Sequence, residues 1–279
     1  MIYCLRNKMH LLTCLDNITA FETSKKILED KNLIVIPNYD LGIYLVKYDK
    51  KISDMSDLDV QKCRGLILSM NDNSLVCVPP FKSLSLNDFN NVIPESSNIT
   101  YEDFIDGTMI NIFRWNESWM ISTRSKIGAD CKWFSEKTFL ELFQDSSENL
   151  DYSMLDNDYC YTVVLQHPDN RIVKSYEKPH FTLVNVRKLN RYTYEDIDLQ
   201  SVHNELKKND VILNIPKVFN FDDLIQTFDF VNKQKYDFQG LVIKSEGFRS
   251  KIRNPKYNYV KKLRGNTNNL KYIYLELRK

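Results

Sequence analysis

The chain has 279 residues, of which 43% are hydrophobic, and its 38 basic and 37 acidic side chains leave a net charge of +1. This length and composition suit one large or two small folded domains, and the near-neutral charge gives no global sign of a nucleic-acid partner. No apolar run approaches the roughly 20 residues that a membrane-spanning helix needs, so we expect no membrane association and a cytoplasmic location.

Cysteine and histidine are too dispersed to indicate a metal centre. The six cysteines contain no Cys-x-x-Cys pair, and the four histidines are scattered along the chain. This pattern argues against a zinc site and favours reduced, packed thiols. We therefore expect no metal and no other cofactor.

The front of the chain is predicted to be mixed α/β. Residues 21–32 have helical spacing with charges on one side, and turn signals separate the apolar runs that follow. We predict strands over 33–37, 43–48, 65–70, 75–78, 108–114 and 119–123. A Trp-Asn-Glu-Ser turn joins the last two strands into a hairpin.

The second half is predicted to be rich in strands, with helices between them. We expect helices over 132–143, 201–208 and 221–233, the last capped by Asn220, and strands over 159–165, 172–176, 181–187, 240–244 and 249–253. An acidic loop rich in Ser and Asn covers 144–158. The order indicates an α+β fold in which helices flank antiparallel sheets.

The end of the chain is basic although the whole is nearly neutral. Residues 244–279 hold eleven Lys and Arg against two Glu, and Tyr257, Tyr259, Tyr272 and Tyr274 are interleaved with them. Such a tract is often only a solvated face. Cations mixed with aromatic rings are also typical of proteins that bind single-stranded nucleic acid, which favours RNA or a phosphorylated nucleotide as the partner.

Several short segments occur in an order that points to one family. They are Lys62 to Leu68 (KCRGLIL), Pro80-Phe81-Lys82, Tyr101 to Thr108 (YEDFIDGT), Ser118 to Arg124 (SWMISTR), His167 to Val173 (HPDNRIV), Thr182 to Arg187 (TLVNVR), Gln239 to Ile243 (QGLVI) and Lys251-Ile252-Arg253. Together they resemble the nucleotidyltransferase domain of bacteriophage-type RNA ligases. The resemblance implies an ATP-grasp-like ligase core over residues 59–264, preceded by an N-terminal α/β region of the same module at 1–58 and followed by a basic tail at 265–279.

The resemblance fails at the residues that perform the family's chemistry. These ligases attack ATP with a lysine two residues before an Asp-Gly pair, and Phe104 stands at that place before Asp106-Gly107. A phenyl ring cannot act as that nucleophile. Two glutamates that the family uses toward ribose and metal correspond to Val164 and Gln239, which hold Mg²⁺ poorly.

The basic groups of the family's pocket are retained. The resemblance implies that Arg64, Lys82, Arg124, Lys251 and Arg253 face phosphates, with Phe104, Asp106 and Gln239 beside them. Buried unpaired cations cost free energy in a domain that binds nothing, so we expect a cationic pocket that needs no metal. Phe104 either fills this pocket or offers a ring on which a base stacks. The alternative that the fold is retained without a binding pocket stays open, because Gly65, Gly107 and Gly240 would be needed for backbone turns in either case.

Three functions follow as hypotheses. The first is a catalytically inactive, RNA-ligase-like protein that binds an RNA 5′ end, capped or uncapped, or a nucleotide. The second is an active ligase or nucleotidyltransferase with a displaced nucleophile such as Lys82 or Lys126. The third is a protein-interaction scaffold, and a protein partner that supplies RNA specificity is compatible with the first. The composition, rich in Asn and Lys, suits a viral or AT-rich genome.

Overall fold

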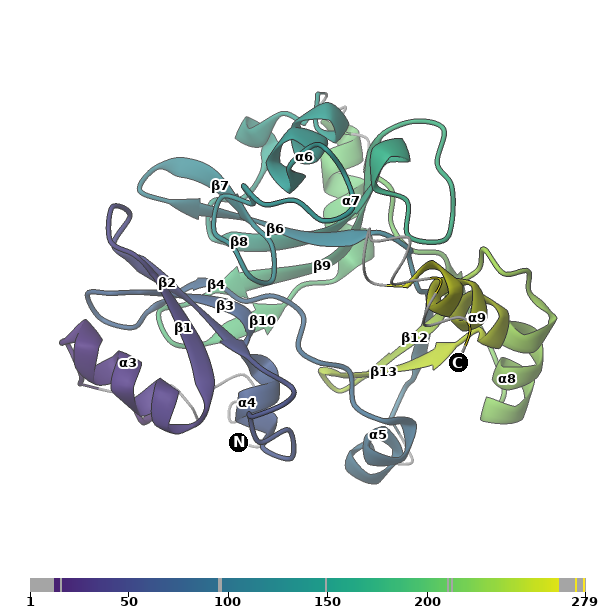
Figure 1. The fold of residues 1–279 in the computed structure, drawn as a ribbon, viewed down its shortest axis with the longest axis horizontal. Coiled ribbons are helices and arrows are strands. Elements are labelled where there is room, and N and C mark those ends of the chain that lie inside the picture. The colour runs from purple at the N-terminus through teal and green to yellow at the C-terminus, as the bar shows by residue number, and fades with distance from the viewer. Residues whose placement is uncertain are drawn as a thin grey trace.

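Three antiparallel sheets with helices on their outer faces build the protein, as the α+β prediction expected (Figure 1). The structure is a computed structural model that describes residues 13–15, 17–94, 97–148, 150–209, 211, 213–265, 274 and 278. None of the helices in this part combines the length and apolar character that crossing a bilayer requires.

The first sheet has the strand order β1-β2-β3-β4. Its strands are β1 (Leu33–Asn38), β2 (Ile43–Tyr48), β3 (Arg64–Ser69) and β4 (Leu75–Cys77), accompanied by helices α3 (Phe21–Asp30) and α4 (Leu58–Lys62). Alternate residues of β2 point to opposite faces: Tyr44 and Val46 pack in the core on the α3 side, and Ile43 and Leu45 pack toward Phe113 of the second sheet. The sheet is therefore covered on both faces, which explains the continuous apolar run of β2.

The second sheet has the order β10-β9-β8-β6-β7 and forms the largest core. It consists of β6 (Thr108–Trp115), β7 (Ser118–Ser122), β8 (Tyr159–Gln166), β9 (His180–Leu189) and β10 (Tyr194–Asp196). Helices α6 (Phe139–Ser146) and α7 (Leu199–Lys208) lie above it in Figure 1 and bury Leu142, Phe143, Val202 and Leu206 against its strands.

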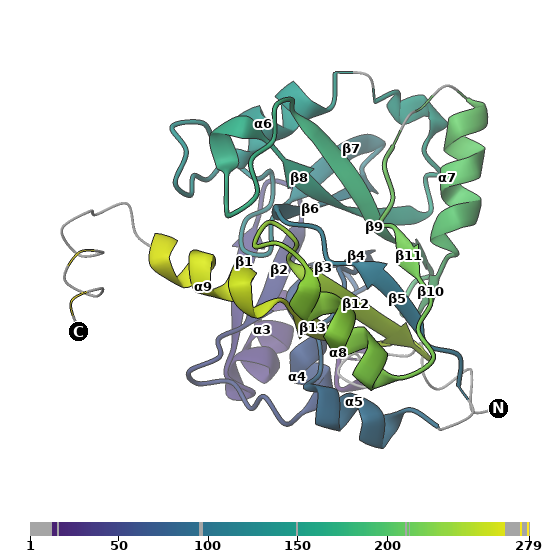
Figure 2. The ribbon, with the colours of Figure 1, turned by 90° about the vertical axis from the view of Figure 1, so that its right-hand side faces the viewer.

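The third sheet contains the strand that leads directly into Phe104. Its order is β11-β5-β12-β13, from β5 (Thr100–Asp103), β11 (Val218–Phe219), β12 (Gly240–Ser245) and β13 (Phe248–Arg253). Helices α5 (Leu86–Val92) and α8 (Leu224–Lys233) bury Phe89 and Val231 against it. Helix α9 (Pro255–Arg264) follows β13 directly and extends to the left of the third sheet in Figure 2.

Two predicted elements were wrong, and three helices were missed. The helix expected over 132–143 begins only at Phe139, because Thr138 and Glu141 form a capping box there. Residues 172–176 form no strand, since the backbone of Val173 and Lys174 donates to a side chain. Helices α4, α5 and α9 were not predicted.

Two further predictions stay open. Of the predicted tail at 265–279, only 265, 274 and 278 are described, and the remainder lies outside the described residues. The division at 58/59 also stays a prediction, although β2 and β3 pair across it within one sheet.

Candidate phosphate-binding pocket

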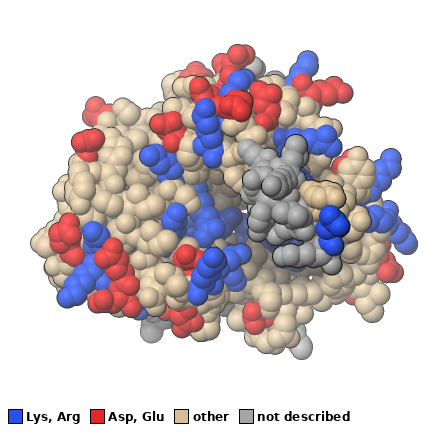
Figure 3. Space-filling view, in the orientation of Figure 1, with Lys and Arg blue, Asp and Glu red and all other residues tan. Residues whose placement is uncertain are grey.

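A pocket of about 270 Å³ lies where strands of all three sheets meet. We call it the Phe104 pocket. Figure 3 shows lysine and arginine side chains gathered in the central hollow of this face. The structure brings together six of the eight predicted site residues in its wall: Arg64, Phe104, Asp106, Gln239, Lys251 and Arg253.

The segment 104–107 turns from the third sheet into the second. Phe104 continues from β5, and its N–H donates to the carbonyl of Gly240 at 3.0 Å. Gly107 and Gly240 have φ of +155° and +135°, and a Cβ would lie 2.3 Å from the Leu165 oxygen or 2.1 Å from the Ile252 oxygen. These two glycines are therefore required by the backbone, whether or not the pocket is occupied.

Asp106 connects separate segments of the chain at the back of the pocket. One of its carboxylate oxygens accepts from the N–H groups of Val173 and Lys174 at 3.0 and 2.8 Å, and the other accepts from the Tyr257 hydroxyl at 2.7 Å. The carboxylate thereby joins β5, the 171–174 segment and α9. Both oxygens are engaged by protein donors, so the structure gives Asp106 a structural role at its predicted place.

Gln239 fixes the same loop from the other side. With its amide nitrogen turned toward them, it donates to the carbonyls of Ile105 at 3.0 Å and Phe104 at 3.3 Å. The Lys251 amine then lies 4.1 Å from the centroid of the Phe104 ring, and the Arg253 guanidinium lies 5.5 Å from it. The ring is thus held in contact with two cations.

Four of the cations that line the pocket have no counter-charge. Arg249, Lys251, Arg253 and Lys261 make no ion pair and no side-chain hydrogen bond within the described part of the chain. Lys244 differs, because its amine lies 2.6 Å from the carboxylate of Glu102. Most of the positive charge at the pocket is therefore available to an anion.

The unpaired cations shift each other's proton affinity. Burial, followed by the charges of Arg249, Arg64, Arg253 and Lys261, lowers the pKa of Lys251 to about 5. Burial and the neighbouring charge of Arg64 lower the pKa of Arg249 to about 10. An anion in the pocket would oppose both shifts.

The structure does not bring Lys82 and Arg124 to this pocket. Arg124 lies over the Tyr48 ring at 4.5 Å, donates to the Tyr48 carbonyl at 3.0 Å and lines a separate surface depression. Lys82 is half-buried, and its amine reaches the Ser83 carbonyl at 3.4 Å. Their contact with a ligand stays a prediction. Lys126 is exposed and lines none of these hollows.

Two of the unpaired cations of the pocket were not identified from the sequence. Arg249 precedes Lys251 by two positions on β13, so the alternation of a strand places both side chains on one face with Arg253. That signal was present in the spacing Arg-x-Lys-x-Arg. Lys261 reaches the pocket from α9, a helix that no local pattern had predicted.

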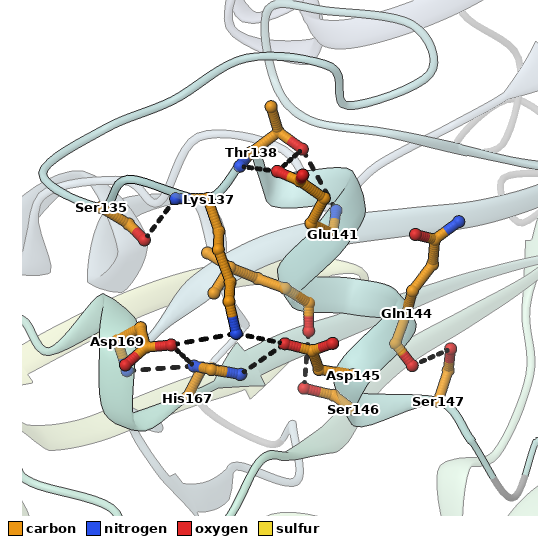
Figure 4. Close-up of polar contacts among 11 residues, drawn as sticks. Ser135, Lys137, Thr138, Glu141, Gln144, Asp145, Ser146, Ser147, His167 and Asp169 are labelled. Carbon is orange, nitrogen blue, oxygen red and sulfur yellow. Dashed lines mark hydrogen bonds and ion pairs between the residues drawn. The ribbon is translucent and has the colours of Figure 1, made fainter.

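A polar network anchors the 167–170 turn, which precedes the two residues whose N–H groups donate to Asp106 (Figure 4). The Lys137 amine bridges Asp145 at 2.8 Å and Asp169 at 3.2 Å. His167 accepts from the Asp169 N–H at 3.0 Å, and burial lowers its pKa. These contacts tie the 167–170 turn to α6, and Asn170 continues the connection by donating to the Thr108 hydroxyl at 2.9 Å.

The donor set around the pocket does not suit a magnesium ion. Val164 stands in the wall without an oxygen, and Gln239 directs its amide at the Phe104 loop. The described residues contain no group of three His, Cys, Asp or Glu side chains arranged to hold a metal. Magnesium prefers several hard anionic oxygens. Of the three carboxylates in this wall, Glu102 is paired with Lys244, Asp106 accepts from protein donors at both oxygens, and burial raises the pKa of Asp103.

Comparison with known proteins agrees with the architecture. No family model matches the chain. It is 33% identical over 96 residues to an RNA ligase of Rhodothermus phage RM378, covering 30% of this chain and 22% of that protein. It is 27% identical over 138 residues to a candidate RNA ligase of African swine fever virus, covering 38% of this chain and 29% of that protein. The chain thus spans less than a third of either relative in these matches.

A solved structure extends the match to almost the whole chain. An archaeal ATP-dependent RNA ligase superposes with a TM-score of 0.61 at 12% identity, covering 97% of this chain and 72% of that one. The chain is thus similar to viral RNA ligases over parts of its sequence and to an archaeal ATP-dependent RNA ligase in its fold. At that identity the structural likeness establishes the fold alone, and the chemistry has to be argued from this chain's own residues.

Proposed function

We propose that this protein binds a phosphorylated RNA 5′ end, capped or uncapped, or a nucleotide in the Phe104 pocket, as a catalytically inactive relative of RNA ligases. The observation that carries the proposal is the set of unpaired cations, Arg249, Lys251, Arg253 and Lys261, around an aromatic ring. That ring stands where the related ligases need a lysine. The pocket therefore offers phosphate binding without the nucleophile.

The geometry also suggests where each part of a ligand lies. Lys251 covers one face of the Phe104 ring, so a phosphate held by Lys251 and Arg253 would lie next to the ring. A base would then use the opposite face or the edge, where the ring borders a second hollow with Tyr176 and Phe238. Charge-assisted hydrogen bonds to phosphate require no metal.

Binding without a metal is the test. We would measure fluorescence anisotropy of short RNAs with a 5′-triphosphate, a cap, a 5′-monophosphate or a 5′-hydroxyl, with EDTA present. We expect saturable binding that depends on the 5′ phosphate and weakens with salt. Failure of all phosphorylated RNAs and of free ATP and GTP to bind would end the proposal.

A matched pair of variants on α9 localises the binding. Lys261 lines the pocket, whereas its neighbour Lys262 is exposed outside it. We expect Lys261→Met to weaken binding by about tenfold, as the loss of one charge-assisted contact implies, and Lys262→Met to change it little. Equal effects of the two changes would indicate attraction to the general surface charge.

Two alternative functions are tested by separate experiments. Incubation with ATP or GTP and magnesium, followed by denaturing mass spectrometry, detects a nucleotide bonded to lysine, which would mean an active enzyme. Lys251 is then the residue to inspect, since Lys82 and Lys126 lie outside the pocket. A protein scaffold would retain its interactions after charge reversal at Lys251 and Arg253.

A further inference from the structure

A second pocket adjoins the Phe104 pocket. It has a volume of about 520 Å³ and shares five wall residues with the Phe104 pocket: Glu102, Val184, Pro216, Lys244 and Arg249. We call it the adjoining pocket. Arg249 thus stands at the junction of two hollows that lie side by side.

The cations of the adjoining pocket are satisfied except at this junction. Arg187 is paired with Asp196 at 2.7 Å, and Lys244 is paired with Glu102 at 2.6 Å. The Arg249 guanidinium has no partner in the described part of the chain, and its Nε is buried without a hydrogen bond. Arg249 is therefore the one cation of this wall without an ion pair among the described residues, and it lies at the border with the Phe104 pocket.

The rest of the adjoining pocket is suited to a neutral, hydrogen-bonding group. Away from Arg249, its wall includes amide side chains, apolar surface and two further carboxylates, among them Asn185, Gln200, Leu199, Phe248, Asp198 and Glu246. These carboxylates disfavour a second anionic group and can accept from the donors of a nucleoside. The Oδ1 of Asn185 is buried without a donor. A nucleoside has donors and a flat apolar face that match such a wall.

We infer that Arg249 binds the phosphate that joins two nucleosides, one in the Phe104 pocket and the other in the adjoining pocket. The ligand is then a phosphate-linked dinucleotide unit of an RNA 5′ end rather than a single nucleotide. This inference rests on the proposed function and specifies its substrate class. An acidic peptide fits less well, because the adjoining pocket has no further unpaired cation among its described residues for a second carboxylate.

Calorimetric titration with AMP and with the dinucleotide pApA separates the inference from the function on which it rests. We expect pApA to bind at least about tenfold more tightly than AMP, because one charge-assisted contact and a second nucleoside are added. If neither binds, the inference is overturned, and the anisotropy series with phosphorylated RNAs, ATP and GTP decides the proposed function separately. If both bind equally, the proposed function stands and the inference is overturned. A parallel titration with 5′–5′ linked GpppA distinguishes a cap-like ligand from an ordinary RNA strand.

Two arginines on one strand provide the matched variants. Arg249 lines both pockets, whereas Arg253 lines the Phe104 pocket only. Arg249→Gln should reduce the preference for pApA over AMP to within about threefold, and Arg253→Gln should weaken both ligands while keeping that preference. An unchanged preference in Arg249→Gln, with native circular dichroism, would overturn the inference.

A third variant tests the adjoining pocket without touching a buried residue. Asn98 is exposed at its rim, so Asn98→Trp should fill part of the hollow and leave the fold intact. We expect weaker pApA binding and unchanged AMP binding. Unchanged binding of both would place the second nucleoside elsewhere and contradict the inference. Tighter binding of poly-glutamate than of pApA would contradict it as well, by indicating an acidic protein partner.

Discussion

Arg187 and Arg249 line the same pocket but have opposite surroundings. Arg187 is 4% exposed, donates to Asp196 at 2.7 Å and to the Pro79 carbonyl at 2.7 Å, and lies 4.2 Å over the Phe81 ring. Arg249 has no such contact in the described part of the chain. Burial alone would lower the pKa of Arg187, yet Asp196 holds it above its ordinary value, whereas the pKa of Arg249 is lowered.

The difference in pairing distinguishes cations that stabilise the fold from cations that are free to bind a ligand. A buried charge costs free energy unless it is paired and hydrogen-bonded, and Arg187 meets both conditions. Arg249, Lys251 and Lys261 do not, so the folded protein keeps them at a cost that an anion would offset. The comparison predicts opposite effects of mutation on stability at the two kinds of site.

Removing the paired arginine should have the largest effect on stability. Arg187→Met leaves the Asp196 carboxylate without its partner, and we expect the free energy of unfolding to fall by about 3–5 kcal/mol. Urea denaturation followed by circular dichroism measures the change. A loss below about 1 kcal/mol would show that Arg187 is not the structural cation described here.

Removing an unpaired cation should stabilise the protein. Lys251→Met replaces the amine over the Phe104 ring with an apolar side chain of similar length, and we expect a gain of about 1–3 kcal/mol at pH 7 with loss of ligand affinity. The lowered pKa means that the unfolded chain binds more protons between pH 5 and the ordinary lysine pKa near 10.4. The gain should therefore shrink as the pH rises through that window. Destabilisation in urea at pH 7 would contradict the comparison.

Ligand binding should be coupled to proton uptake. Burial and neighbouring charges lower the pKa of Lys251 to about 5, and a bound phosphate opposes this shift, so binding takes up as much as about one proton. Affinity should fall by up to about tenfold for each pH unit above pH 5 until the pKa of the bound form is reached. Calorimetry in buffers of different ionisation enthalpy at pH 7.5 counts the protons, and Lys251→Met should show none. Equal uptake by the variant would assign it to another group.

A surface ion pair should have the smallest effect. Arg191 lies 3.0 Å from Asp72, but its side chain is 66% exposed. We expect Arg191→Met to change the free energy of unfolding by less than about 1 kcal/mol and to leave pApA binding unchanged. A loss comparable to that of Arg187→Met would mean that partner geometry, rather than burial, determines the cost.

The sequence determined much of the architecture and most of the residues around the pocket. Apolar periodicity located nearly all the long strands, and ordered motifs named six residues that the structure brings together. Local signals suffice for these, because strand alternation and turn glycines are encoded within a few residues. The absence of a lysine before Asp106-Gly107 is likewise a fact of the sequence alone.

Only the tertiary structure decided which charges are paired. Asp196 is paired with Arg187 and Glu102 with Lys244, whereas Arg249 and Lys251 make no ion pair in the described part of the chain. The Tyr257 hydroxyl donates to Asp106, which lies 151 positions earlier in the chain, and α9 brings Lys261 to the pocket. Pairing depends on contacts between residues far apart in the chain, and no local pattern specifies it. The sequence therefore supplied the cations, and folding determined which of them remain free for a ligand.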